Sequence, residues 1–317
     1  MAGIIDMPYQ TTITRLILLI IILAGALNGC APGGPFQARP QLGDTLQRQT
    51  DEATMVFVPS GEFSMGIDYL GMRYAIQLCK EASTGPGPSG CLGEPYADEM
   101  PAHQVKLDAF WIDRTEVTNQ QYERCVEDQV CSPPSERGSI TRESYFGETE
   151  YSHYPVVWVT RDQAAAYCQW AGGRLPTEAE WEYASRGPES RTFPWGEAFE
   201  PSRANYCDAS CALGPNDPNY DDGYPETAPV GSFPSGESWC GALDMAGNVR
   251  EWVADWFGYY SADLQVNPIG PDEGKTYIPK GGCWLDTQEN LRGSNRGQNT
   301  PDYTRHKVGF RCVLDPD

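Results

Sequence analysis

The stretch from Gly172 to Gly187, GGRLPTEAEWEYASRG, is the part of this chain whose local structure is most narrowly determined. Thr177 can cap a helix with its hydroxyl, and Glu180, three residues later, can bond back to the Thr177 amide, which completes a capping box. Trp181 supplies bulk for a core, and the Gly-Pro pair that follows is typical of a helix end. The pattern predicts a short, capped core helix and indicates no function by itself.

The rest of the chain predicts one α+β domain rich in loops. The 33 glycines and 26 prolines favour turns over long regular elements. Further capping boxes predict helices that begin at Thr118 and Thr160. Short apolar or alternating runs predict strands at about 55–58, 63–65, 105–109, 155–159, 249–256, 278–284 and 310–314.

The N-terminus indicates export. An apolar run at 16–27 suits a signal-peptide core, and Leu-Asn-Gly-Cys ending at Cys30 is similar to a bacterial lipobox. The expected organisation is a lipoprotein signal peptide at 1–29, a flexible tether at 30–52 and the domain at 53–317. Cleavage without lipid and an uncleaved anchor stay open. We expect the protein in the cell envelope, facing the periplasm or the outer surface.

The net charge of −21 argues against nucleic acid or an anionic membrane surface as the main partner. It is compatible with cation binding, although solubility explains it equally well. The turn-rich stretch from 191 to 238 is long for a loop, which favours a bound cation or a binding surface. The three histidines, His103, His153 and His306, are too far apart in sequence to indicate a histidine metal site.

Ten cysteines remain besides Cys30, an even number that suits an oxidising compartment. Their spacing predicts three local disulfides, Cys79–Cys91, Cys125–Cys131 and Cys207–Cys211. The first would hold an insertion at 67–102 that has no clean periodicity.

Five motifs, in order along the chain, resemble the formylglycine-generating enzyme family, also called the sulfatase-modifying-factor domain. They are MVFVPSGEFSMG at 55–66, FWIDRTEVTNQQY at 110–122, GGRLPTEAEWEYASRG at 172–187, GALDMAGNVREWVADW at 241–256 and GFRCV at 309–313. The resemblance implies a variant of the C-type-lectin-like fold. It also implies that Cys168 pairs with Cys312, after which Cys240 and Cys283 are left to pair with each other.

The resemblance further implies two structural calcium sites. The ligands of the first would come from Asn205, Tyr206, Asp222 and Tyr224, and those of the second from Asp244, Gly247, Val249 and Glu251. Carboxylate, amide and backbone carbonyl oxygens are the ligands that calcium prefers. The alternative is that these are turn residues that cap their own backbone.

The family's oxidase activity uses two cysteines, five residues apart, that bind copper shortly after a Gly-Gly pair. Counting from Gly281–Gly282 places Asp286 and Leu291 at these positions, and neither can bind Cu(I), which selects soft sulfur ligands. No catalytic residue is therefore expected there, and copper is not expected. Arg292 and Arg296 lie near the family's substrate groove, where they would hold a peptide or carboxylate or be ordinary surface arginines.

These observations predict a lipid-anchored, monomeric, calcium-stabilised module without oxidase activity, which binds an unknown protein or peptide ligand or serves a structural role. The alternative is an active oxygen-dependent oxidase of the same family, acting on a protein or peptide with Cys240 and Cys283 reduced. An accessory role in a secretion or siderophore system, where such domains also occur, is a third hypothesis.

Overall fold

The structure is a computed structural model that describes residues 39–82, 91, 93–211, 213 and 217–316. The expected signal peptide and Cys30 lie outside the described residues. The chain divides at residue 40, and the unit Pro40–Asp317 contains all of the described helices and strands. In this part of the chain no helix is both long and apolar enough to cross a membrane.

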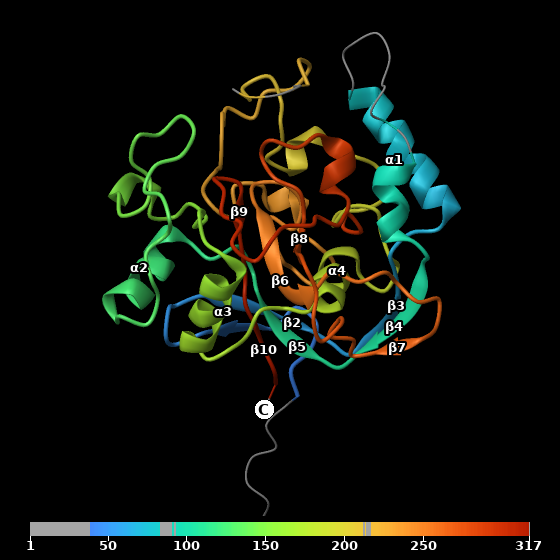
Figure 1. The fold of residues 1–317 in the computed structure, drawn as a ribbon, viewed down its shortest axis with the longest axis horizontal. Coiled ribbons are helices and arrows are strands. Elements are labelled where there is room, and N and C mark those ends of the chain that lie inside the picture. The colour runs from blue at the N-terminus through green and yellow to red at the C-terminus, as the bar shows by residue number, and fades with distance from the viewer. Residues whose placement is uncertain (1–38, 83–90, 92, 212, 214–216, 317) are drawn as a thin grey trace, which may run out of the picture. The chain divides into compact units, whose positions relative to one another are not determined.

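Within the described residues, ten short strands form three small sheets (Figure 1). The four-stranded antiparallel sheet has the order β1 (Thr45–Gln47), β2 (Thr54–Val58), β5 (Phe110–Asp113), β10 (Val313–Leu314). The second sheet consists of β3 (Gly61–Met65), β4 (His103–Leu107) and β7 (Gln265–Val266). The third consists of β8 (Tyr277–Lys280), β6 (Arg250–Trp256) and β9 (Val308–Gly309).

Four α-helices and five short 3₁₀ segments connect these strands, so the mixed helix and sheet composition is as predicted. The α-helices are α1 (Tyr69–Ala82), α2 (Asn119–Glu127), α3 (Arg161–Trp170) and α4 (Glu178–Arg186). The 3₁₀ segments are η1 (Glu94–Glu99), η2 (Thr149–Tyr151), η3 (Pro201–Arg203), η4 (Pro234–Gly236) and η5 (Gln288–Leu291). All three predicted capping boxes, at Thr118, Thr160 and Thr177, are confirmed.

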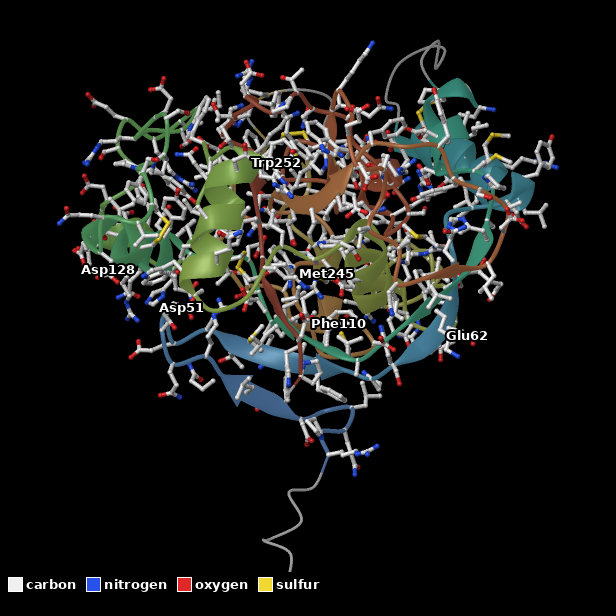
Figure 2. The ribbon with its side chains drawn as sticks, turned by 60° about the horizontal axis from the view of Figure 1, so that its bottom comes forward. Asp51, Glu62, Phe110, Asp128, Met245 and Trp252 are labelled. Atoms are coloured by element: carbon white, nitrogen blue, oxygen red, sulfur yellow. A yellow bond between two sulfur atoms is a disulfide. The ribbon has the colours of Figure 1, made fainter. Side chains whose placement is uncertain are left out.

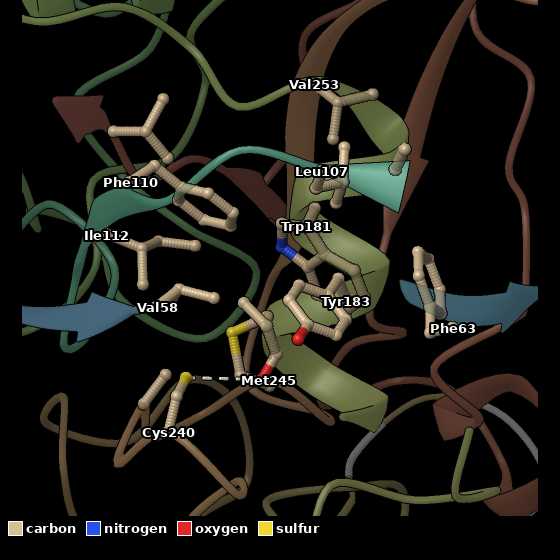
Figure 3. Close-up of a cluster of buried hydrophobic side chains, with 14 of the residues drawn as sticks. Val58, Phe63, Leu107, Phe110, Ile112, Trp181, Tyr183, Cys240, Met245 and Val253 are labelled. Atoms are coloured by element: carbon tan, nitrogen blue, oxygen red, sulfur yellow. Dashed lines mark hydrogen bonds between the residues drawn. The ribbon is translucent and has the colours of Figure 1, made fainter. Parts of the chain in front are cut away.

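Helix α4 lies in the core, and all nine of its residues are buried. Trp181 and Tyr183 pack with Phe110 of β5 and Val253 of β6 in the largest cluster of buried side chains (Figure 3). Figure 2 shows Phe110, Met245 and Trp252 inside the molecule, and Glu62 and Asp128 at its rim. Because one helix contacts strands of all three sheets, it fixes how the sheets lie relative to one another.

The charged side chains of α4 are buried with partners. Glu178 accepts two hydrogen bonds from Arg296, at 2.7 and 2.9 Å. Glu182 forms ion pairs with Lys280 and Arg186. Burial alone would raise the pKa of Glu182, but these two cations lower it to about 2. Removing one member of such a pair costs about 3–5 kcal/mol because the other charge stays buried without compensation.

Several boundaries differ from the sequence prediction. Thr45–Gln47 form strand β1 within the predicted tether of 30–52, because their backbones pair with β2. The insertion at 67–102 contains helix α1, whose exposed Tyr69 and Leu70 obscured its apolar face. Residues 155–159 are mostly buried but form only an isolated bridge between Pro155 and Thr118. Strand β8 ends at Lys280, and residues 281–284 are not part of it.

The three local disulfides and the Cys168–Cys312 disulfide are present as predicted. Cys168 lies on α3, and Cys312 immediately precedes β10. Their bond spans 144 residues. Closing so long a loop restricts the unfolded chain and stabilises the fold by about 4–5 kcal/mol in the chain-entropy account.

Asp255, at the end of β6, is buried against the N-terminus of α4. Its carboxylate accepts a hydrogen bond from the Glu178 amide at 2.8 Å, and its side chain is 4% exposed. Burial, and then the negative charge of Glu178, raise the pKa of Asp255 to about 8. The folded protein therefore holds one more proton than the unfolded chain between about pH 4 and pH 8, and its stability falls as the pH rises through this range.

We predict that Asp255→Asn removes this pH dependence. The side-chain amide oxygen of the new asparagine can still accept the hydrogen bond from the Glu178 backbone N–H, but the side chain carries no charge. The variant should exceed the wild type in unfolding free energy by on the order of a few kcal/mol at about pH 9, and match it at about pH 4. Urea denaturation at both pH values measures the difference. Asp272→Asn, at an exposed position, is the matched control. Parallel pH profiles for Asp255→Asn and the wild type would contradict the assignment.

Candidate functional site

Asp286, at the first copper position, is held in an ion pair. Its carboxylate lies 2.8 Å from the Arg250 guanidinium. It also accepts hydrogen bonds from the backbone amide and the thiol of Cys283, at 3.0 and 3.1 Å. These partners make Asp286 the polar anchor of the turn that follows Gly281–Gly282.

Leu291, at the second copper position, is fully buried at the end of η5. It packs with Phe193, Ala246 and Leu78, the last of which belongs to α1. An aliphatic side chain in an apolar cluster offers no ligand atom. The two copper positions therefore hold an ion-paired acid and a core residue.

The insertion at 67–102 covers this segment. Helix α1 lies directly against η5 (Figure 1). The Gln288 side chain donates a hydrogen bond to the Leu78 carbonyl at 2.9 Å. The insertion is therefore part of the site region.

The two sequence interpretations of Arg292 and Arg296, as ligand contacts or as surface arginines, are both wrong. Both side chains are buried and paired with acids of the same chain. Arg292 is 1% exposed and donates two hydrogen bonds of 2.7 Å to Glu99 of the insertion. Arg296 is bound to Glu178 and donates to the Asp98 carbonyl at 2.7 Å. No local signal predicted the Glu99 contact, because it joins residues 193 positions apart.

Cys240 and Cys283 are free thiols, which corrects the expected disulfide between them. Cys240 lies in the core beside α4, where its Sγ is 3.4 Å from the Ala184 carbonyl. Cys283 instead contacts Asp286. Burial raises the pKa of both thiols, and the neighbouring Asp286 raises that of Cys283 further. Pairing by elimination failed because it assumed that every cysteine in an exported domain is oxidised.

The first predicted calcium set contains buried oxygens without partners among the described residues. Asn205 is 1% exposed. Its side-chain oxygen Oδ1 accepts no hydrogen bond from the described residues, whereas its side-chain nitrogen Nδ2 donates to the backbone carbonyl of Glu226 at 2.9 Å. The Oδ2 of Asp222 is also without a donor. Its Oδ1 accepts from the Tyr224 amide at 2.7 Å. Burial raises the pKa of Asp222 to about 7. The carbonyl of Tyr206 accepts from Asp208.

The second set lies beside the first. The backbone N–H of Asn248 donates to the backbone carbonyl of Asn205 at 2.9 Å. Gly247 packs so closely on the same carbonyl that a Cβ at this position would lie 2.1 Å from the carbonyl oxygen. Both Asn248 and Asp244 adopt positive φ angles, of 56°. The tight turn that carries Gly247 and Val249 is thus fixed by its contact with residue 205.

An additional acid, Glu116, lies with Asp244 and Glu251. Glu251 accepts hydrogen bonds from two of the three guanidinium nitrogens of Arg311, at 2.6 and 2.7 Å. Glu116 is buried, its Oε2 has no hydrogen-bond donor among the described residues, and burial together with Asp244 and Glu251 raises its pKa. Glu116 is not among the predicted calcium ligands, although it lies in the FWIDRTEVTNQQY motif.

No group of three or more histidine, cysteine, aspartate or glutamate side chains in the described part of the chain has the arrangement of a metal site. A cation at either predicted set would therefore also need amide and carbonyl oxygens. The three histidines lie in separate surroundings: His103 bonds to the Pro101 carbonyl, His306 packs between Trp158 and Trp284, and His153 is exposed.

We predict that thiol titration finds two buried thiols. In a Cys30→Ala chain, Ellman's reagent should detect none in the native state and two per chain in guanidinium, because both sulfur atoms are buried. Cys240→Ala and Cys283→Ala should each lower the denatured count by one. A denatured count of zero would mean that the two cysteines are bonded.

Comparison with known proteins agrees with this geometry. The family profile described as "Sulfatase-modifying factor enzyme 1-like domain" matches residues 41–316. Formylglycine-generating enzyme of Bos taurus is 31% identical over 309 residues, covering 84% of this chain and 76% of the relative. Inactive C-alpha-formylglycine-generating enzyme 2 of Bos taurus is 29% identical over 301 residues, covering 82% and 87%.

The solved structure of PvdO from Pseudomonas aeruginosa is also similar. It superposes with a TM-score of 0.66 and 25% sequence identity, covering 88% of this chain and 100% of PvdO. Because the family profile spans nearly all of the described residues, this chain belongs to the formylglycine-generating enzyme family, as a sulfatase-modifying-factor domain.

Proposed function

We propose that this chain is a member of the family without oxidase activity, which acts as a calcium-stabilised binding or structural module. The observation that carries the proposal is the pair of residues at the copper positions. Asp286 is engaged by Arg250, and Leu291 is buried among apolar side chains. A Cu(I) site needs two soft ligands at these places, and neither residue supplies one.

Family membership by itself does not decide the activity, because the relatives include both formylglycine-generating enzyme and a protein named as its inactive counterpart. The finer assignment of the fold, as a variant of the C-type-lectin-like fold, is part of this proposal. So is a lipid anchor at Cys30 in the bacterial cell envelope, which rests on the sequence pattern of the N-terminus alone.

The alternative function is an active oxidase that uses Cys240 and Cys283 in place of the missing pair. One observation favours it: both are free thiols. Their surroundings disfavour it, because one sulfur atom lies against the carbonyl of Ala184 and the other against Asp286. Their raised pKa values also disfavour thiolates, the form that binds metal.

We predict that the purified chain neither binds Cu(I) stoichiometrically nor converts the cysteine of a sulfatase-derived peptide to an aldehyde. Copper titration against a competing chelator and mass spectrometry of the peptide measure these outcomes. Bovine formylglycine-generating enzyme, assayed in parallel, is the positive control. A tight copper site that disappears in Cys240→Ala or Cys283→Ala would establish the alternative function instead.

Calcium is supported by unpartnered oxygens. Asn205 Oδ1 and Asp222 Oδ2 lack donors in the described part of the chain, and a cation would satisfy both. At the second set, a cation would offset the mutual repulsion of Glu116 and Asp244. When bound, calcium would supply positive charge to these loops. The side chains of Asn205, Asp222, Glu116 and Asp244 would hold the ion in place.

We predict that chelation with EGTA lowers the melting temperature by roughly 5 °C, because removing a ligand bound to the folded state removes its share of the stability. Asp222→Asn should melt at a temperature that responds less to EGTA, since the neutral side chain binds calcium more weakly. Asp221→Asn, its exposed neighbour, is the matched control. A melting temperature that EGTA leaves unchanged in all three proteins would remove the proposed calcium sites.

A further inference from the structure

A polar pocket of about 450 Å³ opens beside the turn that carries Asp286. It lies between the insertion, which contributes Tyr96, and the segment from Pro279 to Lys307. Arg250, the partner of Asp286, forms part of its wall. The volume is in the range of small-ligand sites.

The lining of the pocket contains a buried acid with spare hydrogen-bonding capacity. Glu289 is 7% exposed. Its Oε1 accepts from Thr287 and Asn290, but its Oε2 has no donor among the described residues. No cation of the described chain forms an ion pair with it, because nearby Arg292 is bound to Glu99. A buried carboxylate oxygen without a partner is costly, and a ligand that donates to it removes this cost.

The lining also contains a positive charge without a counter-charge. Lys307 lines the pocket and forms no ion pair with the described residues, whereas the charge of Arg250 is balanced by Asp286. Asn295 also lines the pocket and accepts a hydrogen bond from Arg250 at 3.2 Å. The amide of Asn299 adds polar capacity to the same wall. Among the charged groups of the lining, Arg250 and Arg296 are paired with acids, so Glu289 and Lys307 are the two that have no ion-pair partner among the described residues.

We propose that this pocket binds a small zwitterion, with a cationic amine at Glu289 and a carboxylate at Lys307. The assignment rests on the proposed function, since it gives the binding module a ligand class. A ligand with one charge would leave the opposite group of the pocket unpaired, and the loss would be larger at Glu289, which is the more deeply buried group. Charge complementarity therefore selects compounds of the amino-acid class.

The test is calorimetric titration of the purified full chain with a series of ω-amino acids: glycine, γ-aminobutyrate and ε-aminohexanoate. Butylamine and butyrate serve as singly charged analogues. We expect at least one zwitterion of the series to bind, and both analogues to bind at least roughly ten-fold more weakly. If no zwitterion binds, or if an analogue binds equally well, the inference is wrong.

Two variants locate the binding. Glu289→Gln and Lys307→Gln should each weaken binding of the best zwitterion by roughly ten-fold or more, each by removing one charge. Glu273→Gln and Lys275→Gln, at exposed positions outside the pocket, are matched controls and should leave binding unchanged. Lys307 is only half-buried, so Lys307→Gln decides the question if Glu289→Gln fails to fold. Unchanged binding in Lys307→Gln would overturn the assignment.

The copper and peptide assays on the same preparation separate this inference from the proposed function. A chain that lacks oxidase activity and binds no zwitterion contradicts the ligand class alone. A chain that oxidises the peptide contradicts the proposed function, whatever the calorimetry shows.

Discussion

The matching of buried charges around helix α4 is the constraint on which the rest of the structure depends. Four of its nine residues are charged, yet the whole helix is inside the protein. Its three glutamates therefore need cations, which come from separate segments: Arg174, Lys280 and Arg296. Losing Lys280 or Arg296 would leave a buried glutamate without its counter-charge, at a cost that exceeds the worth of most single contacts. The helix thus ties the middle and the end of the domain together by electrostatics, and the start of the domain by packing against β3.

The same principle explains how the insertion became part of the site region. Arg292 is buried and would be unfavourable without a counter-charge, and Glu99 of the insertion supplies it through two hydrogen bonds. The ring of Tyr96 lies 5.1 Å from the Arg292 guanidinium and covers its face. An arginine that sequence reasoning treats as a ligand contact is in this chain a fixed internal partner. Ligand charge must then be recognised elsewhere.

Contacts between residues close in sequence could be predicted from the sequence, and contacts between distant residues mostly could not. The capping boxes at Thr118, Thr160 and Thr177 depend on residues three positions apart, and each formed as predicted. Asp286 and Leu291 could be assigned by counting from a motif. The contact of Arg292 with Glu99 could not, because nothing within 67–102 marks its partner. The free state of Cys240 and Cys283 was missed for a related reason: a pairing by elimination contains no information about distance.

The fold does not depend on a metal site at residues 286 and 291. The charge network of α4 and the Cys168–Cys312 disulfide involve neither residue 286 nor residue 291. Each of these two residues is satisfied locally, because Arg250 neutralises the acid and Leu78 of α1 covers the leucine. The neighbouring pocket keeps polar groups without partners among the described residues, and the proposed ligand would satisfy them.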